Sequence, residues 1–163
     1  MTGSLQDHPG GVRRGALPAA PRTGTGDRSD GGLQGPAARV ARLRAKVPSH
    51  ITIGISGDSV AARGLNAGCE VWYSVIGGLF PEIALQITRL SVAGRAQDAQ
   101  ECSDRLQPLW ALFDKHGGSI RVVATAAELL GLCSGGNLPR PLQTLTGNDR
   151  AELAAVLAAT GLA

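Results

Sequence analysis

The sequence predicts an α/β fold in which two short parallel strands are followed by helices. Two stretches rich in β-branched and aromatic residues, 51–56 and 70–76, are each followed by glycine and then by a helical pattern. This strand–helix–strand–helix order implies parallel pairing through a right-handed crossover. Beyond residue 81 the apolar spacing is helical only. Since two parallel strands alone leave both faces and both edges of a sheet uncovered, the pattern is typical of the end of a larger parallel fold.

The helices follow from apolar spacing and from glycine, proline and capping residues. Val40, Leu43 and Val47 lie on one side of the first helix, which Pro48 ends. The next helix is predicted to run to about Ala67 with Asp58 or Ser59 as its cap, and the one after it to begin at Pro81 and end at Gly94. Three more helices are predicted, one over 102–113 with a kink at Pro108, one over 120–130, and one over 149–160 with Asn148 as its cap. Trp110 and Phe113 lie on an apolar stripe and are predicted to be core residues.

Composition and charge exclude several classes of protein. The chain has 163 residues, of which 43% are hydrophobic and 18% charged, which is typical of one globular domain. Sixteen basic against 13 acidic residues give a net charge of +3, too even for a nucleic-acid footprint. No stretch reaches the ~18 apolar residues of a membrane span, and no apolar segment follows Arg13-Arg14. We therefore expect a cytoplasmic protein without nucleic-acid or membrane partners.

Residues 1–36 differ in composition from the rest of the chain. They hold nine Gly, four Pro and only five large apolar residues, which show no periodicity. Such a segment cannot bury enough apolar surface to offset its ordering entropy, so we predict that it is disordered. Its abundance of residues with GC-rich codons is typical of a coding region read in the wrong frame. Both a frame-shifted segment and a natural flexible extension therefore remain open.

Cysteine and histidine spacing predicts no metal or cofactor site. The cysteines are odd in number, far apart and never in a CxxC pair, so we expect buried free thiols rather than zinc ligands or disulfides. The histidines have no partner at ligand spacing and are expected to be solvated. These residues are Cys69, Cys102 and Cys133, and His8, His50 and His116.

Five landmarks occur in a characteristic order over residues 37–163. They are Ile55-Ser56-Gly57-Asp58, Gly68 to Val75 with Phe80-Pro81, Arg105 to Leu109, Ala124 to Leu132, and Leu138 to Leu142. Together they resemble the C-terminal part of the dihydrodipicolinate synthase / N-acetylneuraminate lyase family of class I aldolases. The resemblance implies a partial TIM (β/α)8 barrel made of the last two β/α units, followed by a C-terminal helical extension. The implied domains are a head over 1–36, a remnant of barrel units six to eight over 37–93, and the extension over 94–163.

The resemblance also implies a chemistry. Members of the family form a Schiff base between a lysine on the sixth strand and the carbonyl of pyruvate or a related 2-keto acid, which requires a partly deprotonated amine. At about 30 residues for each barrel unit, that lysine is expected at about residues 22–32. No lysine occurs there, and the two lysines of the chain, Lys46 and Lys115, lie away from strand ends and are expected to be solvated. We therefore predict no catalytic residue in this chain.

Two residues are candidates for substrate binding. Gly57 and Tyr73 fall at the carboxyl ends of the predicted strands, where barrel enzymes keep their sites, and the resemblance implies that they line the 2-keto-acid pocket. A tight turn at Gly57 and core packing of Tyr73 are the alternatives, and in this chain itself we expect packing or partial exposure of these residues. Intact family members are expected to be homo-oligomers that need no added cofactor. The alternative function is a stand-alone helical protein-interaction module without catalysis.

Overall fold

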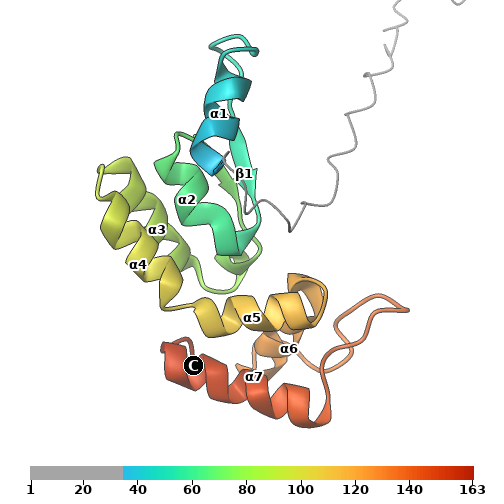
Figure 1. The fold of residues 1–163 in the computed structure, drawn as a ribbon. Helices are drawn as coiled ribbons and strands as arrows, with labels where there is room; N and C mark the ends of the chain where they lie inside the picture. Colours follow the sequence, from blue (N-terminus) through green and yellow to red (C-terminus); the bar gives the residue numbers. More distant parts are fainter. Residues whose placement is uncertain (1–34) are drawn as a thin grey trace, which may run out of the picture. The chain divides into compact units, whose positions relative to one another are not determined.

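A computed structural model describes residues 35–163 of the chain as one unit (Figure 1). The predicted disorder or frame shift of the head lies outside the described residues, except for its last two positions. Two strands and a series of helices follow one another in the order α1 (Pro36–Arg44), β1 (Gly54–Ser56), α2 (Ala61–Asn66), β2 (Val71–Tyr73), α3 (Pro81–Val92), α4 (Ala96–Asp104), α5 (Gln107–Lys115), α6 (Ser119–Leu129) and α7 (Gly147–Thr160), with single 3-10 turns at Asp58–Val60 and Ile76–Gly78. The α/β class is confirmed, and the described chain is mostly helical.

The sheet consists of β1 and β2, which pair in parallel with Gly54 opposite Val71 and Ser56 opposite Tyr73. The crossover helix α2 packs closely on β1, because Gly64 has no side chain at the contact. A Cβ added at Gly64 would lie 2.6 Å from Cγ1 of Ile55. The close approach therefore depends on glycine at this position.

Both strands are shorter than the sequence predicts, and side-chain carboxylates account for it. At the start of β1, the Ile53 amide donates to the Glu70 carboxylate over 2.8 Å. After Tyr73, the amides of Val75 and Ile76 donate to the Asp58 carboxylate, each over 3.1 Å. An amide bound to a side chain cannot join the ladder between strands. The predicted strands 51–56 and 70–76 are therefore reduced to three residues each.

Helices α3 and α4 form a hairpin that turns at Gly94, as predicted. Gly94 has a φ of +73°, and the Arg95 and Gly94 amides donate to the Leu90 and Ser91 carbonyls over 2.9 and 3.0 Å. Only a left-handed residue after the helix permits this pair of bonds, which is why glycine suits the position.

The prediction of a single helix over 102–113 is wrong, because the structure has two helices in this range. Helix α4 ends at Asp104, and α5 begins at Gln107 with Pro108 in its first turn. Proline cannot donate a backbone hydrogen bond and clashes with the carbonyl four residues earlier, here that of Asp104. The chain therefore restarts at Pro108 instead of kinking.

The core lies among α2, α3, α5, α6 and α7. Trp110 and Phe113 are buried, as predicted, with ring centroids 5.5 Å apart, and the Trp110 indole donates to the Ser103 carbonyl over 3.0 Å. The largest fully buried apolar side chains are Trp110, Ile76, Ile87, Leu106, Leu109, Leu112, Leu145, Leu153, Leu157 and Val122. One continuous core thus joins the sheet region to the last three helices.

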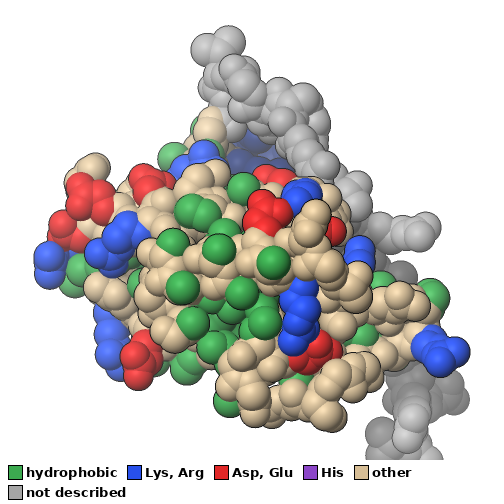
Figure 2. All heavy atoms as spheres, turned by 90° about the horizontal axis from the view of Figure 1, so that it is seen from below, with side chains coloured by type: hydrophobic (Ala, Val, Ile, Leu, Met, Phe, Trp, Pro, Cys, Tyr) green, Lys and Arg blue, Asp and Glu red, His purple; other side chains and the backbone are tan. Residues whose placement is uncertain are grey.

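The segment between α6 and α7 is tied back to α6. Thr125 Oγ1 accepts from the Leu145 amide over 2.8 Å and donates to the Arg121 carbonyl over 2.7 Å. The predicted Asn148 cap is wrong, because α7 starts at Gly147 after Thr146, and no side chain caps it. Figure 2 looks from below Figure 1, the side on which α7 lies, and hydrophobic side chains gather there between charged ones. None of the helices of residues 35–163 is long and apolar enough to cross a membrane.

Candidate functional site

The carboxyl ends of the two strands lie at one edge of the sheet and carry both predicted site residues. Tyr73 is the last residue of β2 and pairs with Ser56, the residue before Gly57. Because the strands are parallel and adjacent, the register brings Gly57 and Tyr73 to the same edge. We call Gly57, Asp58, Tyr73 and Ser74 the strand-end cluster.

Gly57 makes the sharp change of direction from β1 into the following 3-10 turn. Its φ of +106° lies where side chains are strained, and an added Cβ would lie 3.3 Å from Cγ2 of Val60. The tight turn considered for this residue is therefore present. It also leaves the backbone at the strand end without a side chain.

Tyr73 is largely open to solvent in the described chain, with 66% of its surface exposed. Its ring lies over Gly54 of β1, where an added Cβ would be 2.6 Å from Tyr73 Cε2. Core packing of Tyr73 is thus wrong. Ser74 points back into its own turn, where its hydroxyl accepts from the Gly77 amide over 2.8 Å.

Asp58 is the buried polar residue of the cluster, with 6% of its surface exposed. Its predicted role as a helix cap is wrong, and Ser59 does not cap the helix either. Its Oδ1 accepts from the Trp72 indole and the Val75 amide, and its Oδ2 from the Ile76 amide, all over 3.1 Å. The carboxylate therefore ties the end of β1 to the end of β2. All its partners are donors, so it is held as an acceptor and has a structural role.

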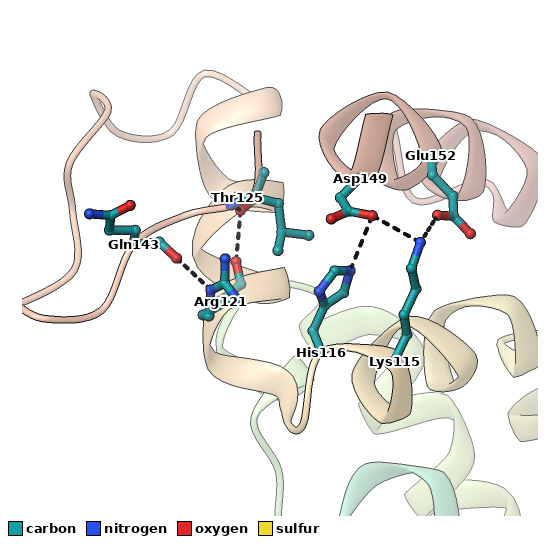
Figure 3. Close-up of polar contacts among 8 residues, drawn as sticks. Lys115, His116, Arg121, Thr125, Gln143, Asp149 and Glu152 are labelled. Atoms are coloured by element: carbon teal, nitrogen blue, oxygen red, sulfur yellow. Dashed lines mark hydrogen bonds and ion pairs between the residues drawn. The ribbon is translucent and has the colours of Figure 1, made fainter. Parts of the chain in front are cut away.

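Neither lysine lies near the strand ends. Lys46 is exposed in the turn after α1. Lys115, at the end of α5, is ion-paired to Asp149 over 2.9 Å and to Glu152 over 2.6 Å (Figure 3). Hydrogen bonds from Lys115 to these carboxylates raise its pKa to about 12. A Schiff-base nucleophile needs the opposite, an amine whose protonated form is disfavoured.

The histidines and cysteines form no metal site in the part of the chain that the structure describes. His50 is exposed as predicted, and His8 lies outside the described residues. The prediction of a solvated His116 is wrong, because its side chain is 8% exposed and its Nε2 lies 3.9 Å from Asp149 (Figure 3). Cys69 and Cys102 are buried free thiols as predicted, whereas Cys133 is exposed. The prediction of a buried thiol is therefore wrong for Cys133, which lies in the segment between α6 and α7.

The strand-end cluster offers surface and hydrogen-bonding groups but no nucleophile paired with a base. It contains one phenol, one hydroxyl and one carboxylate, and the last two are engaged with backbone amides. Sequence patterns could not reveal the Asp58 contacts, because its three donors lie 14 to 18 residues further along the chain. What the cluster can do is line one side of a pocket.

Two parallel β/α units followed by helices, with glycine and tyrosine at the carboxyl edge, are the arrangement expected at the end of a β/α barrel. Residues 33–160 match the model of the dihydrodipicolinate synthetase family. The chain belongs to this family. No curated protein matches it.

Solved structures agree with the family assignment. The dihydrodipicolinate synthase of Agrobacterium tumefaciens is 42% identical, with a TM-score of 0.72 over 78% of this chain and 42% of that chain. The 4-hydroxy-tetrahydrodipicolinate synthase of Methylacidiphilum fumariolicum is 25% identical, with a TM-score of 0.68 over 80% and 43%. The enzyme of Acinetobacter baumannii, solved with pyruvate, is 20% identical, with a TM-score of 0.66 over 78% and 42%. The chain thus spans about two fifths of the length of these relatives.

Proposed function

We propose that this chain supplies the last two β/α units and the helical extension of a lyase that acts on pyruvate or a related 2-keto acid through a Schiff base. The observation that carries the proposal is the position of Gly57 and Tyr73 at the ends of adjacent parallel strands in a chain of this family. Barrel enzymes build their sites at this edge. The family assignment favours this function over a stand-alone interaction module.

Within the proposed site, Gly57 and Tyr73 line the 2-keto-acid pocket and do no covalent chemistry. The bare backbone of Gly57 lets a planar keto acid lie close to the end of β1. Tyr73, at the end of β2, is exposed, and in our proposal its ring, which lies over Gly54 in this structure, turns toward the strand ends to form a wall of the pocket. The pyruvate bound in the A. baumannii enzyme supports this substrate class. The domain division at residues 36 and 93 and the homo-oligomeric state of the complete enzyme belong to the same proposal.

The nucleophile of the reaction is not among the residues of this chain in our proposal. A lysine amine attacks the keto carbon, the carbonyl oxygen leaves as water, and the iminium accepts the electron pair of the bond that breaks. Lys115 is held protonated by two carboxylates, and Lys46 lies at the far end of the loop that leads into β1. The chain alone is therefore expected to form no iminium.

Trapping with borohydride tests the missing nucleophile. The 163-residue protein is incubated with pyruvate and sodium borohydride, which reduces any iminium to a stable secondary amine, and its intact mass is measured. We expect an unchanged mass. A stoichiometric adduct at Lys46 or Lys115 would contradict the proposal.

A chimera tests the site itself. The six preceding β/α units of the A. tumefaciens relative are joined to residues 37–163, and trapping is expected to give one adduct on the lysine of the added part, in an oligomer by gel filtration. In this background Tyr73→Ala should raise the KM for pyruvate, because a wall of the pocket is removed. The matched control is Val92→Ala, a position that is 82% exposed on α3. If both variants keep the parent KM, Tyr73 does not line the pocket.

A further inference from the structure

A cleft of about 490 Å³ lies away from the strand-end cluster and belongs to no part of the proposed site. Three segments that are distant in sequence enclose it, namely the start of α3, the junction of α4 and α5, and the end of α7. Its size falls within the range of about 300–1,000 Å³ that is usual for sites that bind small organic molecules.

Polar and apolar groups share the walls of the cleft about equally, and the apolar part is continuous with the core. Phe80 and Leu106 are buried, at 8% and 2% exposure, and present their surfaces to the cleft. Leu79, Ile83 and Leu162 are partly buried around them. A ligand with a hydrocarbon body would therefore remove apolar surface from water on both sides of the contact.

Arg105 places a positive charge on one wall of this cleft. Its Nη2 donates to Cys102 Sγ over 3.1 Å, which places the guanidinium beside the cleft in this structure. Among residues 35–163, no carboxylate lies within ion-pair distance of Arg105. The remaining N–H groups can thus donate to a ligand. A guanidinium suits a carboxylate best, because two parallel hydrogen bonds form at once.

We propose that this cleft binds a small organic monocarboxylate with an apolar body. The carboxylate accepts from Arg105, and the body lies against Phe80 and Leu106. Glu82, the one acidic side chain lining the cleft, opposes any negative charge on a ligand, so we restrict the proposal to a single carboxylate held by Arg105. The site shares no residue with the strand-end cluster, so the outcome of its test does not depend on the proposed lyase function.

Calorimetric titration of the 163-residue protein tests both parts of the ligand. The probes are 4-phenylbutyrate, its neutral analogue 4-phenylbutanamide, and acetate, which has the head group without the body. We expect 4-phenylbutyrate to bind at least about tenfold more tightly than the amide or acetate. A hydrogen bond to a charged group and the burial of a ring each change the dissociation constant by a factor of about ten or more. Equal affinity for the acid and the amide would overturn the proposal, as would no binding of the acid at millimolar concentration.

Two charge-matched variants test the location. Arg105→Gln removes the guanidinium from the cleft, whereas Arg89→Gln removes the same charge from an exposed position of α3 outside it. Arg105→Gln should abolish the preference for the acid over the amide, and Arg89→Gln should retain it. Circular dichroism checks that both variants keep the parent helix content. A preference that survives in Arg105→Gln would place the acid elsewhere and refute the assignment.

Cys102 provides a second, local readout. Its thiol lines the cleft, whereas Cys133 is exposed elsewhere and serves as an internal control. Bound 4-phenylbutyrate should slow the alkylation of Cys102 by iodoacetamide and leave that of Cys133 unchanged, as followed by peptide mass. Because Cys102 is only 5% exposed, its alkylation is first measured in the free protein under native conditions. If that rate is measurable and is unchanged when the calorimetry detects binding, the ligand occupies a different site.

Discussion

The Asp58 carboxylate joins the ends of the two strands through hydrogen bonds. It is buried and accepts three hydrogen bonds, two of them from backbone amides of the segment that follows β2. A buried carboxylate is stable only when its oxygens are satisfied by donors in this way. Asp58 therefore fixes the path of the chain from Tyr73 into α3.

Replacing Asp58 with asparagine should destabilise the fold without changing the volume of the side chain. The new amide group presents a donor to at least one N–H group that now donates to the carboxylate, so a buried donor is left unsatisfied. We expect a loss of about 1–3 kcal/mol in the free energy of unfolding, measured by urea denaturation. The control is Asp114→Asn at an exposed position of α5, which should change stability by less than about 0.5 kcal/mol. Equal stability of the two variants would refute this role of Asp58.

Glu70 should contribute to acid sensitivity. A hydrogen bond from the Ile53 amide, and then one from Arg44, lower its pKa below the usual 4.5. A carboxyl group with a lowered pKa stabilises the folded state above its unfolded pKa, and this contribution is lost as the pH falls through the folded pKa. The thermal midpoint should thus decline less below about pH 4.5 in Glu70→Gln than in the parent protein. Glu82→Gln, which removes an equal charge without a backbone hydrogen bond, should decline as the parent does.

At the scale of single residues, the sequence predicted features of one element more reliably than contacts between elements. The burial of Trp110 follows from periodicity and was predicted correctly. The turn at Gly57 is present, and it was considered as the alternative to pocket lining. The role of Asp58 and the burial of His116 depend on partners in other elements. No local pattern specifies such partners, so these predictions were wrong.

At the scale of elements, the closest contact is that of α2 with β1. Gly64→Ala adds a methyl group where Ile55 Cγ1 and Cβ would lie 2.6 and 2.8 Å away, so the helix has to move. We expect a loss of about 1–3 kcal/mol from overpacking, although alanine favours a helix by about 1 kcal/mol relative to glycine. The measurement is chemical denaturation. Gly78→Ala is the control, because an added Cβ there has no neighbour within 4 Å and stability should barely change.

The order of the elements was predictable, and their ends were not. Strand–helix–strand–helix order and the Gly94 turn follow from composition and spacing. The ends of both strands depend on carboxylates that compete for backbone amides. The sequence also does not decide the effect of Pro108, because a proline inside an apolar stripe is compatible with either a kinked helix or the start of a new helix. Tertiary packing decides between these outcomes.

At the scale of the whole molecule, the sheet and the segments next to its strands present apolar side chains to solvent. Tyr73, Val75 and Ile51 are 66%, 43% and 44% exposed, and β1 and β2 have no third strand beside them in residues 35–163. We expect the protein to bind a hydrophobic fluorescent dye, and the chimera with six further β/α units to bind much less. Equal dye fluorescence of the two proteins at equal concentration would show that the added units do not cover this surface.

The family resemblance was the most informative prediction from sequence, and it was correct over residues 33–160. It depended on several short landmarks that occur in one order along the chain. The head has no such landmarks. From its composition we expect that deleting residues 1–34 leaves the helical circular dichroism and the thermal midpoint unchanged. A lower midpoint in the deletion variant would mean that the head packs on the rest of the chain.

The shared acceptor at Asp58 makes two neighbouring amides a reporter of local opening. Val75 and Ile76 donate to the two oxygens of one carboxylate, so neither amide can be released to deuterated solvent for long while Asp58 stays in place. Their hydrogen–deuterium exchange should therefore be slow and should proceed through the same opening event. Exchange of this pair ahead of the amides of α5 would reveal that the strand ends separate while the helical core is still intact.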